Sequence, residues 1–311
     1  MNPRFRSPAI VGVLFASLAT VIACGPAASP SPSPSSGPND SPGASGEGEI
    51  FPNIISGELI EGENRIIFTF QAASGQPIAT PDRTASVTFT GPGGETVAGS
   101  DPEFVWSIED VVGLYVTKAT FPVAGDWMAS FTTAAPDSPE QTIPFSFQVK
   151  TDASVVWPGE DAPSVDTPTL ADVGGDVAKI SSDADPDPAF YETSVADALA
   201  AKEPFVLVFA TPKFCQTKTC GPTLEKIKAV AADHPDVTFI NVEPYLLEDV
   251  EGQLQPDLSA DGQLQAAPAT TAYGLLVEPF VFVVDADGVV TDSYELIFTT
   301  DEIDAALDAL S

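Results

Sequence analysis

The stretch Val206-Leu-Val-Phe-Ala-Thr-Pro-Lys-Phe-Cys215 joins an apolar run to a cysteine, and a second cysteine, Cys220, follows five residues later. An unbroken apolar run of this length, from 204 to 210, is typical of a strand buried on both faces of a sheet. From Pro222 to Asp233 the apolar residues recur at helical spacing. The sequence therefore predicts a buried strand, a loop with two cysteines, and a helix that begins near Cys220.

The segments around this stretch alternate in the same way. Further strands are expected at 237–242, 280–284 and 289–298, with a hairpin turn at 285–288. Helices are expected after Ser194, up to about Tyr273 and over 301–310 with Thr300 as the N-cap, while 244–265 reads as irregular. The predicted order, starting from the buried strand at 204–210 that precedes the cysteines, is βαβ-α-ββα.

The segment 206–215 resembles the strand and loop that precede the redox cysteine of thioredoxin-like proteins. Glu278-Pro279-Phe280 resembles the segment that places a proline against the cysteines in that family. The resemblance covers roughly residues 186–311. It implies an α/β thioredoxin-like fold for this part, with Cys215, Cys220 and Pro279 as the catalytic residues.

The cysteine spacing departs from the Cys-x-x-Cys pattern of the family. Counted from the strand, Cys215 takes the place of the nucleophile, whereas the match Cys220-Gly-Pro gives that place to Cys220 and leaves Thr223 as its partner. Both registers stay open. A disulfide needs a Cα separation of about 4.4–6.8 Å, so a Cys215–Cys220 bridge requires residues 216–219 to be non-helical.

Three functions fit this pair of cysteines. The first is thiol–disulfide exchange, which would make the chain an oxidoreductase, because reactive thiols lie between a strand and a helix N-terminus. The second is a structural disulfide in a non-enzymatic surface interaction protein. The third is copper handling, because paired thiolates bind Cu(I).

No metal or other cofactor is expected in the native chain. His234 is the only histidine, and it lies about 20 Å along the predicted helix from Cys220, at 1.5 Å per residue. It therefore cannot complete a copper site at the cysteines and is expected to cap the C-terminus of the helix. A chain with one histidine also offers no base for a serine or cysteine hydrolase triad beyond His234, so a hydrolase is excluded. Glu243, Lys213 and Lys218 are the charged residues that could tune a thiol, and they are expected to be solvated.

Residues 50–150 carry short runs with apolar residues at every second position, separated by Gly- and Pro-rich turns. The runs lie at 65–71, 85–90, 113–121, 126–131 and 143–149. They predict an all-β immunoglobulin-like sandwich. The phrases Gly113-Leu-Tyr115 and Phe121 to Trp127 resemble the YtkA-like modules of extracytoplasmic bacterial proteins. The expected fold class is thus two domains, this sandwich followed by an α/β thioredoxin-like fold.

The first 49 residues read as a leader and a tether. Residues 1–23 have two arginines and a short apolar run, as in a signal peptide. Val21-Ile22-Ala23-Cys24 resembles a bacterial lipobox, which implies lipidation of Cys24. Residues 24–49 are then a disordered Pro/Ser-rich tether, and 151–185 is a linker of similar composition. With these features the chain is similar to bacterial thioredoxin-domain lipoproteins.

The chain is strongly acidic, with a formal net charge of −33. Such a charge repels nucleic acid and anionic headgroups, so the sequence predicts no nucleic-acid partner. The expected partners are the membrane, reached through the lipid on Cys24, and a protein thiol or disulfide. The expected location is the cell membrane, on its extracytoplasmic face.

Overall fold

The computed structural model describes residues 49–310, and these belong to one compact unit. The predicted signal peptide, the predicted lipidation site Cys24 and the predicted tether as far as residue 48 lie outside the described residues. Among the helices of residues 49–310, none has the length and apolar character needed to cross a membrane.

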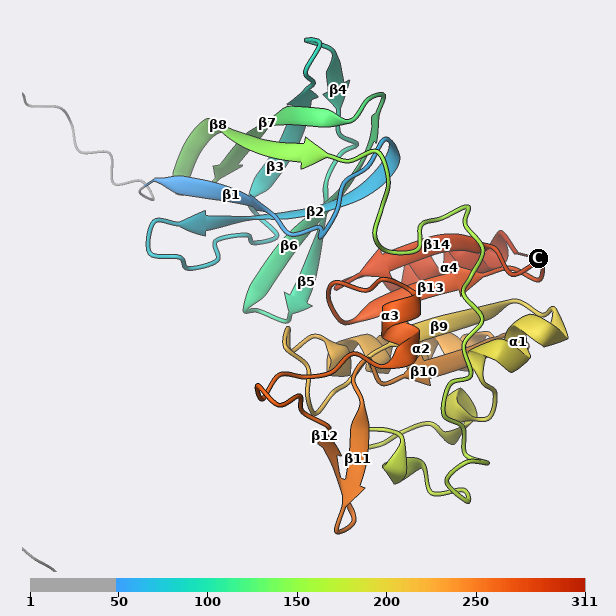
Figure 1. Ribbon diagram of the computed structural model, residues 1–311. Coiled ribbons are helices and arrows are strands. Elements are labelled where there is room, and N and C mark those ends of the chain that lie inside the picture. The colour runs from blue at the N-terminus through green and yellow to red at the C-terminus, as the bar shows by residue number, and fades with distance from the viewer. Residues whose placement is uncertain (1–48, 311) are drawn as a thin grey trace, which may run out of the picture. The chain divides into compact units, whose positions relative to one another are not determined.

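The first part of the described chain folds into two antiparallel sheets of four strands each (Figure 1), in the orders β1-β2-β6-β5 and β4-β3-β7-β8. All neighbouring strands in these sheets pair antiparallel. The strands are β1 (Ile50–Ile54), β2 (Gly62–Ala72), β3 (Thr84–Thr90), β4 (Thr96–Ala98), β5 (Glu103–Ile108), β6 (Val112–Phe121), β7 (Gly125–Ala135) and β8 (Ser138–Val149).

Aromatic side chains fill the space between these two sheets. Phe68 of β2 lies with its ring centroid 4.9 Å from that of Phe131 on β7 and 5.3 Å from that of Tyr115 on β6. Alternate residues of a strand point to opposite faces, so Ile66, Phe68 and Phe70 enter this core. The next residue on the other face, Ile67, packs instead with Ile297 of the C-terminal part.

The C-terminal part contains a mixed four-stranded sheet in the order β10-β9-β13-β14. Strand β9 pairs parallel with β10 and antiparallel with β13, which pairs antiparallel with β14. The helices are α1 (Val195–Ala201), α2 (Cys220–Asp233), α3 (Pro268–Ala272) and α4 (Thr300–Asp308). The strands are β9 (Phe205–Phe209), β10 (Thr238–Val242), β11 (Leu247–Val250), β12 (Gln253–Pro256), β13 (Phe280–Val284) and β14 (Val290–Glu295).

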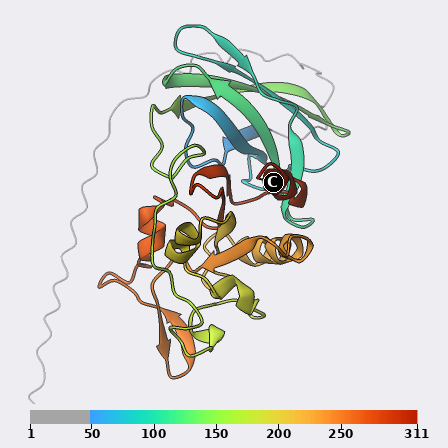
Figure 2. The ribbon, with the colours of Figure 1, turned by 90° about the vertical axis from the view of Figure 1, so that its right-hand side faces the viewer.

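The two central strands of this sheet are buried at every residue, as the apolar run predicts. On one face Val206 and Val208 pack with residues of α2 and α4, and on the other Phe205, Leu207 and Phe209 pack with residues of α1 and α3. Strands β11 and β12 form a separate hairpin that projects from the sheet (Figures 1 and 2). Residues 151–185 contain one short 3-10 helix, Val177–Lys179, and no strand or α-helix.

The predicted fold class needs correction. Strands hold 39% of the structure and helices 16%, so it is predominantly β, and no α/β thioredoxin-like fold is evident in the C-terminal part. Helices α1 and α3 span only seven and five residues, and β11 and β12 add strand where the sequence reads as irregular. The resemblance rests on short local segments around the cysteines and Pro279, and such segments do not fix the class of a whole chain.

One local expectation about helix ends also changes. The N-cap of α4 is Thr299 and not Thr300: its hydroxyl accepts from the N–H of Glu302, whose carboxylate accepts from the N–H of Thr299, a capping box. Helix α2 begins at Cys220 itself, so Pro222 is its third residue. The expected cap of α1 is correct, since the Ser194 hydroxyl accepts from the N–H of Asp197.

Candidate functional site

The candidate site is the loop between the end of β9 and the start of α2. After Phe209 the chain passes through a turn at 212–214, and residues 216–219 form a bend that is not helical. Lys218 has a φ of 67°, a left-handed conformation that interrupts the approach to the helix. The condition that the sequence sets for a Cys215–Cys220 bridge is therefore met.

Cys215 and Cys220 form a disulfide with a Cα separation of 6.1 Å. Cys220 is fully buried in the first turn of α2, and Cys215 is partly exposed on the loop. The N–H of Cys220 donates to Sγ of Cys215 over 3.3 Å, so this sulfur lies at the N-terminus of α2. Only Cys215 is therefore open to attack from solvent.

Glu278, immediately before β13, is the acidic neighbour of this disulfide. A carboxylate oxygen of Glu278 and the two sulfurs lie within 4.8 Å of one another. The side chain is only 5% exposed. One carboxylate oxygen accepts the N–H of Gln216 over 2.6 Å, and the other accepts the hydroxyl of Tyr245 over 2.8 Å. A group that accepts on both oxygens fits the charged carboxylate form.

Further contacts fix the loop to the segment before β13. The hydroxyl of Thr217 donates to the backbone carbonyl of Glu278 over 2.8 Å and lies 2.7 Å from the hydroxyl of Thr219. Pro279 follows Glu278 through a cis peptide bond, and its carbonyl accepts from Leu296. Burial raises the pKa of Tyr245, and the adjacent Glu278 raises it further, so this hydroxyl stays a neutral donor.

A second buried acid lies at the end of β10. Glu243 is 8% exposed, which contradicts the expectation that it is solvated. One oxygen accepts the N–H of Ser182 over 2.6 Å, and the other has no partner among the described residues. Burial raises the pKa of Glu243 to about 7, and the nearby Asp183 raises it further, although the hydrogen bonds from Thr211 and Ser182 oppose the shift.

Lys213 and His234, two of the other charged residues of interest, have partners other than the sulfurs. Lys218 is exposed, and the Lys213 ammonium donates to the carbonyl of Leu254 on β12 over 3.1 Å. His234 caps the C-terminus of α2, as expected, and its Nε2 lies 3.0 Å from a carboxylate oxygen of Asp304 on α4. None of these residues is a ligand or proton donor at the disulfide.

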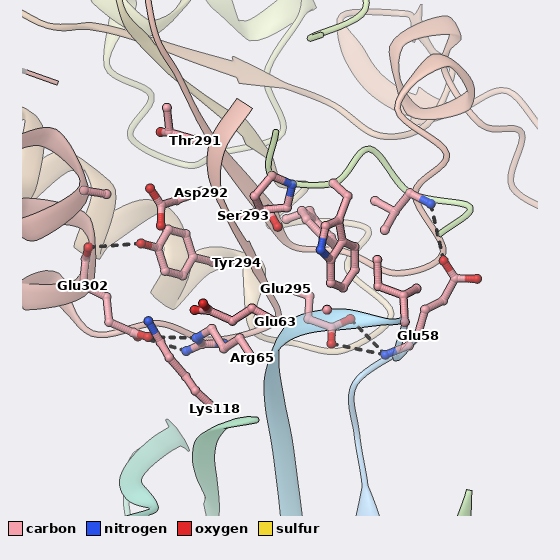
Figure 3. Close-up of a pocket in the computed structure, with 18 of the residues that line it drawn as sticks. Glu58, Glu63, Arg65, Lys118, Thr291, Asp292, Ser293, Tyr294, Glu295 and Glu302 are labelled. Carbon is pink, nitrogen blue, oxygen red and sulfur yellow. Dashed lines mark hydrogen bonds and ion pairs between the residues drawn. The ribbon is translucent and has the colours of Figure 1, made fainter. Parts of the chain in front are cut away.

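A cleft of about 870 Å³ lies among the described residues. It is lined by β2, β14, α4 and the segments 57–61, 155–158 and 276–280. Figure 3 shows Arg65 of β2 and Glu302 of α4 meeting near Lys118 and Tyr294. The guanidinium of Arg65 binds both carboxylate oxygens of Glu302, at 2.8 and 2.9 Å, and lies 5.5 Å from the centre of the Tyr294 ring.

The acidic residues of this cleft differ in the direction of their pKa shifts and in their hydrogen-bond partners. Burial raises the pKa of Glu295, whose carboxylate accepts the N–H of Gly57, and burial also raises the pKa of Asp292. Burial acts in the same direction on Glu302, but the hydrogen bonds and charge of Arg65 outweigh it and lower the pKa. Glu58 is bound by Lys150 and by the N–H and hydroxyl of Ser154. The cleft therefore offers an acidic wall beside the exposed apolar Leu276.

Comparison with known proteins does not identify a family for this chain. No family model and no curated protein matches the chain. Among solved structures, it is similar to a DUF4426 family protein of Pseudomonas aeruginosa, with 14% identity and a TM-score of 0.26 over 33% of this chain and 91% of the other. It is also similar to the Lin-41 filamin domain, with 17% identity and a TM-score of 0.21 over 32% and 93% of the two chains. A third similarity is to the Escherichia coli adhesin FdeC, with 18% identity and a TM-score of 0.22 over 39% and 36%. Similarities at these TM-scores assign neither a fold nor a function.

The sequence identified the cysteines and Pro279 but not the role of Glu278. From the sequence, Glu278 stands out only as part of the Glu278-Pro279-Phe280 motif. The signal that could have found it is the buried strand that follows directly, β13, which draws its first residues into the core. Glu243 shows the same pattern, since it directly follows the buried end of β10.

Proposed function

We propose that this chain is a non-enzymatic, lipid-anchored interaction protein of the extracytoplasmic face, in which the Cys215–Cys220 disulfide is structural. One observation carries the proposal for the disulfide. The buried carboxylate of Glu278 lies within 4.8 Å of both sulfurs. Reduction at this place would create a thiolate beside an existing negative charge, whereas the disulfide itself is neutral.

The two opposing electrostatic effects on a thiolate of Cys215 differ in size. Two unit charges at the 4.8 Å limit of this cluster repel each other by about 3 kcal/mol at an effective dielectric constant of roughly 20. A helix N-terminus stabilises a nearby negative charge by only about 0.3–1 kcal/mol at ordinary sites. The repulsion from Glu278 therefore exceeds the help that α2 gives to a thiolate of Cys215, and the thiolate that disulfide exchange requires is disfavoured.

The anchor and the interaction role rest on different features. The segment Val21-Ile22-Ala23-Cys24 supports a lipid on Cys24, and a disulfide is typical of proteins outside the cytoplasm. Support for an interaction role comes from the cleft, which places the exposed side chain of Leu276 beside acidic residues of β14 and α4. A surface that combines apolar and charged groups in a hollow is suited to holding a partner.

The midpoint potential of the Cys215–Cys220 couple tests the structural role. We expect a value below about −300 mV, the range of structural disulfides. Glu278→Gln keeps an acceptor for the N–H of Gln216 but removes the charge. At a pH well above the ordinary thiol pKa of about 8.5, where a released thiol ionises, the potential should therefore rise by up to roughly 60 mV, the equivalent of about 3 kcal/mol for two electrons. Glu248→Gln, the same change on the exposed face of β11, should leave the potential unchanged.

Thiol–disulfide exchange is the second candidate, because Sγ of Cys215 is partly exposed and accepts the N–H of Cys220 at the start of α2. An exchange protein should have a potential of about −120 to −270 mV. It should also reduce a protein disulfide or oxidise a protein dithiol in a reaction that Cys215→Ser abolishes. A potential in this range together with such turnover would contradict the structural proposal.

Mass spectrometry of the mature protein tests the anchor. We expect the N-terminal residue to be Cys24 carrying a diacylglycerol, and Cys24→Ala should leave the chain unprocessed and unlipidated. A mature N-terminus at any other residue would remove the support for a lipid anchor.

A further inference from the structure

We propose that Cys215, Cys220 and Glu278 form a binding site for a Zn²⁺ ion when the disulfide is reduced. The proposal goes beyond the structural role of the disulfide, because it concerns the dithiol form. Its basis is the convergence of two sulfurs and a buried carboxylate oxygen, all within 4.8 Å of one another, from two separate segments of the chain.

The spacing of these three atoms suits one ion. Zinc binds cysteine sulfur at about 2.3 Å and carboxylate oxygen at about 2.0–2.2 Å in a tetrahedral arrangement, so two such sulfurs lie about 3.8 Å apart. On reduction the two sulfurs must therefore move apart while both stay close to Glu278. The bend at 216–219 carries Cys215 on a non-helical segment, so this sulfur can move without unwinding α2.

Glu278 is held in place as a metal ligand requires. The N–H of Gln216 and the hydroxyl of Tyr245 each donate to one of its oxygens, which fixes the plane of the carboxylate. Such second-layer hydrogen bonds orient ligands in metal sites. Each carboxylate oxygen retains a free lone pair beyond these bonds, so an ion can bind without breaking them.

The charges at the site explain why it would take a divalent cation. Two thiolates and a carboxylate in a buried place repel one another strongly, which is the same effect that disfavours the metal-free dithiolate. A Zn²⁺ ion compensates most of this charge, and the fourth position is left for water, because the distant His234 cannot reach it. The carboxylate oxygen in this donor set also favours Zn²⁺ over Cu(I), because Cu(I) prefers soft ligands and two thiolates suffice for it.

The chemistry of loading is balanced with a phosphine as the reductant. The phosphine and one water convert the disulfide to two thiols and become a phosphine oxide. Binding of Zn²⁺ by the two thiols then releases two protons to solvent and forms two Zn–S bonds. No electron is transferred in this second step, so the oxidation state of the metal is unchanged.

The test uses the full chain in a Cys24→Ser background, so that Cys215 and Cys220 are the only thiols. After phosphine reduction and removal of the phosphine without oxygen, the protein is titrated with Co²⁺ as a spectroscopic probe, and the Co²⁺ is then displaced by Zn²⁺. We expect one equivalent, with thiolate-to-cobalt charge-transfer absorption. Zn²⁺ should also protect both thiols of this chain from alkylation, a readout that needs no variant at the site.

Variants then assign the three ligands. Glu278→Gln should weaken Zn²⁺ binding at least tenfold, whereas Glu248→Gln on β11 should bind like the parent chain. Cys215→Ser should abolish the charge-transfer band, with circular dichroism as the control for folding. The proposal is overturned if the reduced parent chain binds no ion or its thiols stay unprotected, or if Glu278→Gln binds Zn²⁺ as tightly as the parent. The midpoint potential tests the structural disulfide separately, because it is measured without metal.

Discussion

The interior of the sandwich and the interior of the C-terminal part differ in the kinds of side chain that they bury. Between the two sandwich sheets the buried side chains are largely aromatic, with Phe68, Phe131 and Tyr115 in mutual contact. In the C-terminal part, two acids, Glu243 and Glu278, are buried at the ends of core strands, one of them beside a disulfide.

The sandwich part also buries Glu58 and Arg83, but Lys150 pairs with Glu58, and Arg83 donates to the carbonyl of Ile78. One oxygen of Glu243, by contrast, has no partner among the described residues. The difference teaches that buried charge is the more costly to maintain in the C-terminal part.

The largest effect is expected from the aromatic core of the sandwich. Phe68→Ala removes a fully buried ring and leaves a cavity, which should lower the free energy of unfolding by about 3–5 kcal/mol. Phe51→Ala is the matched control, because Phe51 on β1 is 46% exposed and its loss should change stability by no more than about 0.5 kcal/mol. Denaturant unfolding measures both. Equal effects would show that the sandwich core does not carry the stability assigned to it.

The buried acid of β10 should produce an effect of the opposite sign. The pKa of Glu243 is raised to about 7 in the folded protein, so between pH about 4.5 and 7 the folded state binds more protons than the unfolded state. Stability should therefore fall as pH rises through this window and stay constant above it, with a total loss of about 3 kcal/mol. Glu243→Gln keeps an acceptor for Ser182 and should be more stable than the native chain at pH 8 by about this amount.

Denaturant unfolding at pH 4 and pH 8 tests whether the buried charge of Glu243 lowers stability. At pH 4 both states of the native chain hold the proton on Glu243 to a similar extent, so the native chain and Glu243→Gln should differ little. Glu248→Gln, on the exposed strand β11, should follow the native chain at both values. A benefit of Glu243→Gln that is the same at pH 4 and pH 8 would show that burial of the charge is not its cause.

The smallest effect is expected from the ion pair in the cleft. Arg65 and Glu302 are 12% and 20% exposed in their side chains and bind through two hydrogen bonds, so a double-mutant cycle with Arg65→Met and Glu302→Gln should give a coupling of about 1–2 kcal/mol. The pair Lys179–Asp176, at 45% and 54% exposure and 3.7 Å, should couple by less than about 0.5 kcal/mol. Equal coupling in the two pairs would contradict the role given to burial.

The sequence is most informative where the hydrophobic pattern is strong. All five runs expected in the sandwich are strands, but β1, β4 and β5 were missed, because β4 has only three residues and the other two lack regular alternation. The sequence predicts no strand at β11 or β12, because the residues of this hairpin are mostly polar and exposed. Strand pairing, which depends on distant parts of the chain, holds these segments in place and leaves no local pattern.

The candidate site was predictable only in part. The cysteines and the non-helical bend between them follow from spacing and disulfide geometry. The burial of Glu278 and Glu243 does not, because it depends on where strands β13 and β10 bring residues that look like loop acids. The motif matches were short, and they led to a fold class for the C-terminal part that the overall strand content corrects.

Strand β2 has a consequence for how this chain can change in evolution. One face of β2 supplies Ile66, Phe68 and Phe70 to the sandwich, and the other supplies Arg65 and Ile67 to contacts with Glu302 and Ile297. Because side chains alternate with a period of two, inserting or deleting a single residue within Gly62–Ala72 would exchange the two sets and put a guanidinium among phenylalanine rings. Insertions and deletions of one residue should therefore be absent from β2 in functional variants, while the exposed tip of the β11–β12 hairpin, at Glu251 and Gly252, can vary in length.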